Sequence, residues 1–129
     1  MKRIQVADVG WRDSRGWGIE PLKAVGLPER VLKDLHVVSM EPGSVRGNHC
    51  HPNAREWLLV LGGPAEVVWL SESGASNRSG LGDDEVPLFE IPPGTAHAIQ
   101  NTSEKLIYLV SFGDTADRVT VKSVPPLIP

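Results

Sequence analysis

Two histidines and a glutamate gather in one short window of the sequence, between Gly43 and Gly63. His49 and His51 are two residues apart, so on an extended strand both side chains project to the same face. Glu56 follows five residues after His51, and the intervening Pro52-Asn53 pair predicts a turn. Such a turn allows Glu56 to return on the next strand and to face inward. Imidazole nitrogens and carboxylate oxygens are ligands that divalent transition metals accept in proteins.

A second window supplies one more histidine. It reads Pro92-Pro93-Gly94-Thr95-Ala96-His97, so a Pro-Gly turn delivers His97 at the start of a later strand. Three imidazoles and one carboxylate inside a barrel would bind a single divalent ion, for which Zn, Fe, Mn, Ni and Co are all suitable. A six-coordinate ion with four protein ligands keeps two positions for water or substrate, as a catalytic site does. The predicted metal ligands are His49, His51, Glu56 and His97.

These windows resemble the two sequence motifs of the cupin family. The first motif, G-x5-H-x-H-x3,4-E-x6-G, is matched at Gly43, His49, His51, Glu56 and Gly63. The second, G-x5-P-x-G-x2-H-x3-N, is matched at Pro92, Gly94, His97 and Asn101, with Val86 in place of its leading glycine. The resemblance covers roughly residues 35–112. It implies an all-β jelly-roll barrel, usually a homodimer, that holds a metal in the barrel mouth through the four ligands named above.

A weaker resemblance concerns the substrate. The segments Asp13-Ser14-Arg15-Gly16 and Arg46-Gly47-Asn48-His49 resemble segments of nucleotide-sugar epimerases and ketoisomerases, which are also cupins. The stretch Gly-Asn-His-x-His is most similar to the metal-binding cupin of capsular-sugar epimerase and reductase proteins. The resemblance implies an isomerase or epimerase that acts on a carbohydrate or nucleotide sugar. An Fe(II)-dependent dioxygenase and a binding or sensing protein without turnover are alternatives for the same ligands.

An isomerase needs groups beyond the metal ligands, because a proton must be removed and returned. Tyr108 follows on the strand after His97 and could be the acid, although a half-buried aromatic on a barrel strand is an equal alternative. Glu41 and Glu90 are the other candidate acid-base groups. Arg15 and Arg46 could bind a diphosphate or carboxylate of the substrate through paired hydrogen bonds, or could be surface charges.

The remaining histidine and aromatic residues have simpler interpretations. His36 sits in an apolar strand and is expected to face outward. Trp57 should point away from Glu56, where it could line a dimer interface. Trp11 and Trp17 flank Arg15 and could cover the barrel mouth or stack on a ligand, or could simply pack in a core.

The elements that must position these residues are predicted to be strands. Apolar runs between turn residues predict strands at 4–9, 35–40, 56–61, 65–70, 86–91, 97–101, 105–112 and 118–124. Gly62-Gly63-Pro64 predicts a hairpin between the third and fourth of them. Residues 71–84 predict an exposed loop, and residues 29–34 the one short helix. The proline-rich tail, PPLIP, is expected to lie along a sheet edge.

Composition agrees with a single all-β domain. The chain has 129 residues with 13 glycines and 11 prolines, which excludes a helix bundle. We expect an N-terminal extension at about 1–34, a barrel at 35–112, and a strand and tail at 113–129. A net charge of −3 and no long apolar run argue against nucleic-acid and membrane partners, leaving a small-molecule ligand in the barrel. The lone Cys50, expected to be buried and turned away from the metal, predicts a cytoplasmic protein.

Overall fold

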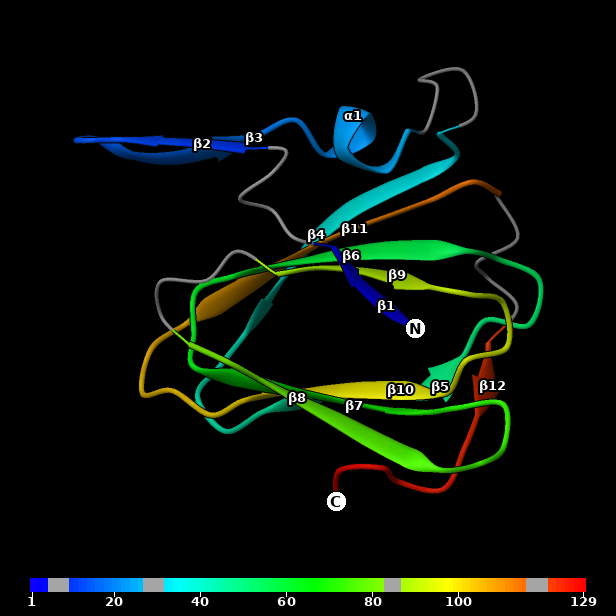
Figure 1. Ribbon diagram of the computed structural model, residues 1–129. Coiled ribbons are helices and arrows are strands. Elements are labelled where there is room, and N and C mark those ends of the chain that lie inside the picture. The colour runs from blue at the N-terminus through cyan, green and yellow to red at the C-terminus, as the bar shows by residue number, and fades with distance from the viewer. Residues whose placement is uncertain (5–9, 27–31, 83–86, 116–120) are drawn as a thin grey trace.

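The computed structural model describes residues 1–4, 10–26, 32–82, 87–115 and 121–129 (Figure 1). Two five-stranded antiparallel sheets face each other. The first has the order β1-β9-β6-β11-β4, with bounds Lys2–Ile4, Leu88–Ile91, Glu56–Leu61, Ile107–Gly113 and Asp34–Met40. The second has the order β12-β5-β10-β7-β8, with bounds Lys122–Ser123, Val45–Cys50, His97–Asn101, Ala65–Leu70 and Ser76–Leu81. A hairpin, β2 (Gly10–Asp13) and β3 (Gly16–Ile19), and the helix α1 (Pro21–Val25) precede β4.

The main core fills the space between the two sheets. Alternate side chains of each strand point inward, as the pleat of a strand requires. The buried members of this core are Met40, Leu58, Val60, Ala65, Val67, Leu81, Phe89, Ile91, Ile99, Ile107 and Leu109. Leu58, Ile99 and Leu109, three members of this core, also line the cavity described below.

A second apolar cluster covers the outer face of the first sheet. Trp57 is only 5% exposed there, and its ring stacks on Phe112 with the ring centroids 5.7 Å apart. Residues of α1 pack against this cluster, among them Leu22 and Val25. Trp57 therefore points away from the cavity, as expected, but it is buried under its own chain. The expectation that Trp57 lines a dimer interface is wrong, because its surface is already covered.

The chain crosses between the sheets after β6. Strands β6 and β7 lie at the predicted residues, yet β6 pairs with β9 and β11, whereas β7 pairs with β8 and β10. The predicted hairpin at Gly62-Gly63-Pro64 is therefore wrong, and these residues form a connection between sheets. The predicted loop at 71–84 is also corrected, because residues 76–81 form β8 and pair with β7 along their whole length.

The N-terminal part contains elements that the sequence did not predict. The hairpin β2–β3 and the helix α1 both lie before residue 26. Residues 29–31 of the helix expected at 29–34 lie outside the described residues, and the rest of this expectation is wrong, because residues 32–33 are not helical and Asp34 already belongs to β4. Residues 5–9, Val86 and residues 118–120 of the other expected strands also lie outside the described part of the chain.

Strand β12 lies at the edge of the second sheet, but the proline-rich tail does not follow that edge as expected, because Ile128 packs on the outer face of the sheet against Val68 and Ala98. Strand β12 pairs with β5 at Cys50 and His49, so this short strand supports the element that carries the histidines. Among the described residues, no helix has the length and apolarity needed to cross a lipid bilayer.

Candidate metal centre

Strands β5 and β10 bring two of the predicted ligands together. The two strands are antiparallel neighbours, and His97 is the direct cross-strand partner of His49. A bulge follows His97, and Gly47 sits against it with a φ of +95°. A Cβ atom at position 47 would lie 2.7 Å from the carbonyl oxygen of His97, which is too close for any side chain. The glycine therefore permits the approach of the two histidine-bearing strands.

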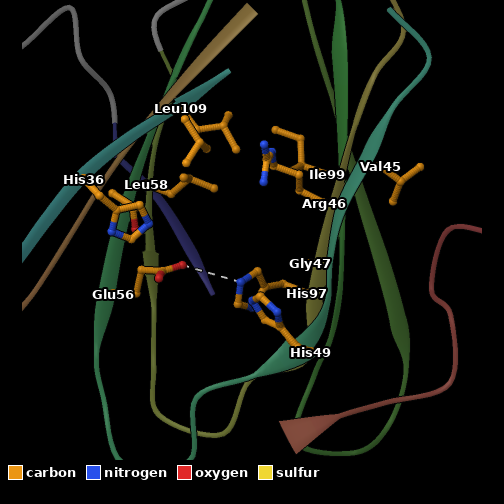
Figure 2. A pocket seen from close by; sticks show the side chains of 12 residues that line it. His36, Val45, Arg46, Gly47, His49, Glu56, Leu58, His97, Ile99 and Leu109 are labelled. Carbon is orange, nitrogen blue, oxygen red and sulfur yellow. Dashed lines mark ion pairs between the residues drawn. The ribbon is translucent and has the colours of Figure 1, made fainter. Parts of the chain in front are cut away.

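His51 and Glu56 complete the group from opposite sides of a turn. His51 follows the end of β5, and its carbonyl oxygen accepts a hydrogen bond from the Gly94 amide at 2.9 Å. Glu56 is the first residue of β6 in the facing sheet, and it points back toward the histidines (Figure 2). The turn therefore works as the sequence predicted, and it carries the chain from one sheet to the other.

The four side chains converge within a few ångströms. The carboxylate oxygens of Glu56 lie 3.5 Å from His97 Nε2 and 3.7 Å from His51 Nε2. The ring centroid of His49 is 4.8 Å from that of His51 and 5.1 Å from that of His97. His51, Glu56 and His97 are each less than 7% exposed. A carboxylate buried this deeply is stable only where a positive charge compensates it, and a metal ion held by these side chains would do so.

His97 is held in the orientation of a metal ligand. Its Nδ1 lies 2.9 Å from the backbone carbonyl oxygen of Thr95, and a carbonyl can only accept a hydrogen bond. The proton therefore sits on Nδ1, and the Nε2 lone pair faces Glu56. A hydrogen bond from the second ring nitrogen to a carbonyl is the usual support of metal-binding histidines.

The donor set suits a divalent ion after small side-chain rotations. Within the described ranges, no three His, Cys, Asp or Glu side chains already surround a point at which they could hold an ion. Two ligands that share an ion at about 2.1 Å stand roughly 3 to 4 Å apart, so the His97–Glu56 and His51–Glu56 separations are compatible with a shared ion. Side-chain rotations that move the donor atoms by a few tenths of an ångström are inexpensive, so these buried donors can close around an ion.

A cavity of about 390 Å³ opens beside these residues, between the two sheets (Figure 2). His49, Glu56 and His97 line it, and Arg46 reaches it from the second sheet. The guanidinium Nε of Arg46 donates to the carbonyl oxygen of Ser39 at 3.1 Å, which fixes the arginine at the rim. The apolar wall is formed by Val38, Val45, Leu58, Ile99 and Leu109.

Arg15 is placed apart from this cavity. It belongs to the turn between β2 and β3, its side chain is 86% exposed, and its guanidinium lies 2.7 Å from the Asp13 carboxylate. This hydrogen bond lowers the pKa of Asp13 and raises the pKa of Arg15. Trp11 and Trp17 line a small separate hollow with Arg15, so they do not cover the mouth of the barrel.

The three candidate acid-base groups also lie outside the cavity. Tyr108 is 45% exposed, and it faces the side of β11 opposite to Leu109, which lines the cavity. Glu41 is exposed in the turn after β4, and Glu90 lies 3.5 Å from Arg55 on the outer side of β9. None of the three is among the residues that surround the cavity.

Two polar residues in the cavity were missed by the sequence analysis. His36 lines the cavity, which corrects the expectation that it faces outward, and Ser111 lies beside it on β11. The apolar neighbours Leu35 and Val37 suggested the opposite orientation, yet they are 60% and 61% exposed. The fully buried Met40, four residues after His36, has the same strand parity and would have indicated the inward face.

Comparison with known proteins identifies the family. A family model described as "Cupin" matches residues 31–129. The chain belongs to the cupin family. A protein named "Probable oxalate decarboxylase" from Arthroderma benhamiae is 36% identical over 106 residues, 81% of this chain and 25% of that protein. "Oxalate decarboxylase OxdC" from Bacillus subtilis is 33% identical over 86 residues, 65% of this chain and 22% of that protein. This cupin thus spans about a quarter of the length of these curated relatives.

Solved structures confirm the all-β jelly-roll fold of this cupin. The capsular polysaccharide assembling protein CapF from Staphylococcus aureus superposes with a TM-score of 0.65 at 18% identity, over 92% of this chain and 34% of that protein. A structure of oxalate oxidase superposes with a TM-score of 0.61 at 24% identity, over 70% and 45% of the two chains. The resemblance to cupins that the two motifs carried is therefore confirmed.

Proposed function

We propose that this cupin is a metal-dependent enzyme that acts on a small carboxylic acid in its barrel cavity. The observation that carries the proposal is the convergence of His49, His51, His97 and Glu56 at a cavity that an arginine also lines. A divalent ion held by these four residues would polarise a bound oxygen and stabilise negative charge on it. Zn, Fe, Mn, Ni and Co all suit imidazole and carboxylate ligands, so the donor set does not select among them.

The rest of the cavity supports an acidic substrate. Arg46 presents a planar guanidinium at the rim, and this group pairs with a carboxylate through two parallel hydrogen bonds. Leu58, Ile99 and Leu109 form an apolar wall that excludes water, which strengthens the electrostatic contacts made inside. The volume of about 390 Å³ is near the lower end of the range for small-molecule sites, and it favours a small acid over a nucleotide sugar.

The relatives support the same substrate class. The curated proteins similar to this chain are named oxalate decarboxylases, at 33% to 36% identity. Oxalate, the compound in these names, is a small dicarboxylic acid, so it belongs to the substrate class proposed here. The chain spans only about a quarter of the length of these proteins, so their names do not fix its substrate. Oxalate is therefore one candidate to be tested among other small acids.

A carbohydrate isomerase or epimerase is the second candidate. It requires a proton-transfer group near the metal, and Tyr108, Glu41 and Glu90 do not line the cavity. His36 is the observation that favours this candidate, because it is an ionisable side chain in the cavity that is not one of the four proposed ligands. An iron-dependent dioxygenase and a binding protein without turnover would use the same four ligands, so only assays separate them.

Metal analysis of purified protein tests the ligands. We expect about one divalent ion per wild-type chain, and at least a tenfold loss of metal affinity in His97→Ala and Glu56→Gln. Glu90→Gln is the matched control, because Glu90 lies on the outer face of the same sheet and should leave the metal content unchanged. Circular dichroism would verify that all three variants are folded. Equal metal content in all four proteins would refute the ligand assignment.

Assays of the metal-loaded protein then separate the functions. We expect oxalate and other small acids to raise the Tm and to be turned over, with carbon dioxide release as the readout. Oxygen uptake that requires iron would favour the dioxygenase, and turnover of nucleotide sugars alone would favour the isomerase. A raised Tm without any turnover would favour a binding protein.

We also propose that this cupin forms a homodimer. Strand β4 ends the first sheet, and Leu35 and Val37 are exposed on its outer face. Exposed apolar side chains beside a sheet edge are a common site of association between chains.

A further inference from the structure

Ser111 buries a hydroxyl group at the wall of the cavity. It lies on β11, is 4% exposed, and lines the cavity beside Leu109. Among the residues that the structure describes, none forms a hydrogen bond with its Oγ. A buried hydroxyl without a partner lowers the stability of a protein, so such a group persists where it serves another purpose. The cavity that Ser111 lines is the place from which a ligand could supply the missing hydrogen bond.

His36 stands directly beside Ser111. The two residues are cross-strand partners in the pairing of β4 with β11, and both line the cavity. The Nδ1 atom of His36 lies 3.3 Å from the carboxylate of Asp34, which is two residues earlier on the same strand. A carboxylate only accepts hydrogen bonds, so Asp34 favours the tautomer with its proton on Nδ1 and orients the ring. In this tautomer the imidazole lone pair is on Nε2.

Together the two side chains match a hydroxyl group. The Ser111 hydroxyl can donate a hydrogen bond, and the Nε2 lone pair of a neutral His36 can accept one. An alcohol both donates and accepts, so one alcohol group can form a hydrogen bond with each of the two residues. A ligand with a methyl or methylene group at this place would leave the buried Ser111 hydroxyl without a hydrogen bond. Sites that hydrogen-bond a substrate hydroxyl discriminate strongly against analogues that lack it.

The position of this pair relative to Arg46 indicates the kind of molecule. His36 belongs to the first sheet and Arg46 to the second, and the cavity lies between them (Figure 2). Ser111 is the cross-strand partner of His36 and lies on the same wall. A ligand that carries both a carboxylate and a hydroxyl can therefore reach the two walls at once. We propose that Ser111 and His36 form a subsite for a substrate hydroxyl, and that the substrate is a small hydroxy acid; this rests on the function proposed above.

Two pairs of acids that differ by one hydroxyl group test the proposal. Lactate with propionate and glycolate with acetate are the probes, and binding to the metal-loaded protein is measured by calorimetry. We expect wild type to bind each hydroxy acid at least about tenfold more tightly than its partner. A metal can itself chelate a hydroxy acid, so the informative quantity is the change in this preference upon mutation. In Ser111→Ala and His36→Leu we expect most of the preference to be lost, with unchanged metal content.

Thermal stability separates a binding role of Ser111 from a structural one. Because its hydroxyl is buried without a partner among the described residues, Ser111→Ala should have an equal or higher Tm than wild type in the absence of acid. Ser39→Ala is the matched control, since Ser39 lies on the exposed face of β4 and should change neither the Tm nor the preference.

The outcomes distinguish this inference from the function on which it rests. If wild type binds all four acids and Ser111→Ala keeps the preference for a hydroxyl, the subsite is refuted while the acid-binding function stands. A lower Tm of Ser111→Ala with unchanged binding would refute the subsite as well. If wild type binds none of the acids, the proposed function and the subsite both fail.

Discussion

Gly47 shows how a single residue determines whether the candidate metal centre can form. It sits two positions before His49, at the point where β5 approaches the bulge in β10. A Cβ atom there would lie 2.7 Å from the His97 carbonyl oxygen and 2.9 Å from Ala98 Cα, both of them backbone atoms. The φ of +95° is also unfavourable for residues with a side chain. Neighbouring strands can place His49 and His97 together because this position has no side chain.

Gly47→Ala should therefore weaken both the fold and the metal centre. We expect the free energy of unfolding to fall by roughly 1–3 kcal/mol, because the new methyl group meets backbone and the φ becomes strained. Metal affinity should fall at least tenfold, because the strands that carry His49 and His97 are pushed apart. Denaturant unfolding and metal titration are the measurements.

Gly80→Ala is the control for this substitution. Gly80 also lies on a strand of the second sheet, yet a Cβ atom there has nothing within 4 Å. We expect this variant to match wild type in stability and in metal affinity. If the two variants behaved alike, the steric argument for Gly47 would be wrong.

Asn101 illustrates a motif residue whose role is structural. Its side chain is fully buried and donates to the carbonyl oxygens of Met40 and Lys105 at 3.0 and 2.7 Å. Its carbonyl oxygen accepts from the amide and the hydroxyl of Ser103 at 2.9 and 2.6 Å. This network fixes the turn between β10 and β11. Asn101 matches the second motif without a predicted role, since the only ligand predicted from that motif is His97.

At the scale of elements, the end of β5 is tied to the C-terminal segment. The Asn48 side chain accepts hydrogen bonds from the amides of Leu127 and Ile128 at 2.7 and 3.3 Å. It also donates to the Ile128 carbonyl oxygen at 3.0 Å. Asn48 has a φ of 57°, a conformation that asparagine tolerates better than most residues. The tail is thereby held against the strand that carries His49.

Asn48→Gly should release the tail without straining β5. Glycine adopts a φ of 57° freely, so the variant removes the side-chain hydrogen bonds alone. We expect faster amide hydrogen exchange in residues 121–129 and a loss of stability of roughly 1–3 kcal/mol. Asn48→Asp should give an intermediate result, because aspartate keeps the two acceptor bonds and loses the donor. Unchanged exchange in the tail of Asn48→Gly would show that β12 alone holds this segment.

The sequence predicted individual strands better than their partners. The apolar runs at 35–40, 56–61, 65–70 and 97–101 coincide with β4, β6, β7 and β10 to within a residue. The sequence did not predict which strands pair with each other. An apolar run such as β6 could belong to either sheet, and only the course of the following connection decides between them. The polar strand β8 was missed, since an edge strand with exposed serine and arginine side chains resembles a loop in composition.

The sequence predicted those site residues whose convergence follows from their spacing along the chain. It missed the residues whose place in the cavity depends on which face of a strand points inward. The His49–His51 spacing and the turn before Glu56 sufficed to predict that these residues converge. His36 and Ser111 lie on strands whose inward face is set by neighbouring strands and by exposure. Two exposed apolar residues on β4 suggested the wrong face, and only the burial of Met40, which the structure shows, identifies the face of His36 as the inward one.

At the scale of the whole molecule, the outer face of the first sheet is covered unevenly. Helix α1 and its neighbours pack over Trp57 and Phe112 (Figure 1). Leu35, Val37 and Tyr108 remain 60%, 61% and 45% exposed toward the β4 edge of the same face. Val37 is the ladder partner of Val110, and Tyr108 pairs with Ser39, so these side chains form one continuous patch. No other described strand pairs with the outer side of β4.

This patch is where we expect the proposed homodimer to form. Burying exposed Leu, Val and Tyr side chains of two copies is favourable at about 25 cal/mol per Å² of apolar surface, and two β4 edges could extend the sheets. Sedimentation analysis at micromolar concentration should show a dimer for wild type and a monomer for Val37→Lys. Val121→Lys is the control, because Val121 is 49% exposed but lies before β12, in the segment that runs along the second sheet. A monomeric wild type at the same concentration would contradict the dimer, and dissociation by Val121→Lys but not by Val37→Lys would move the interface to the second sheet.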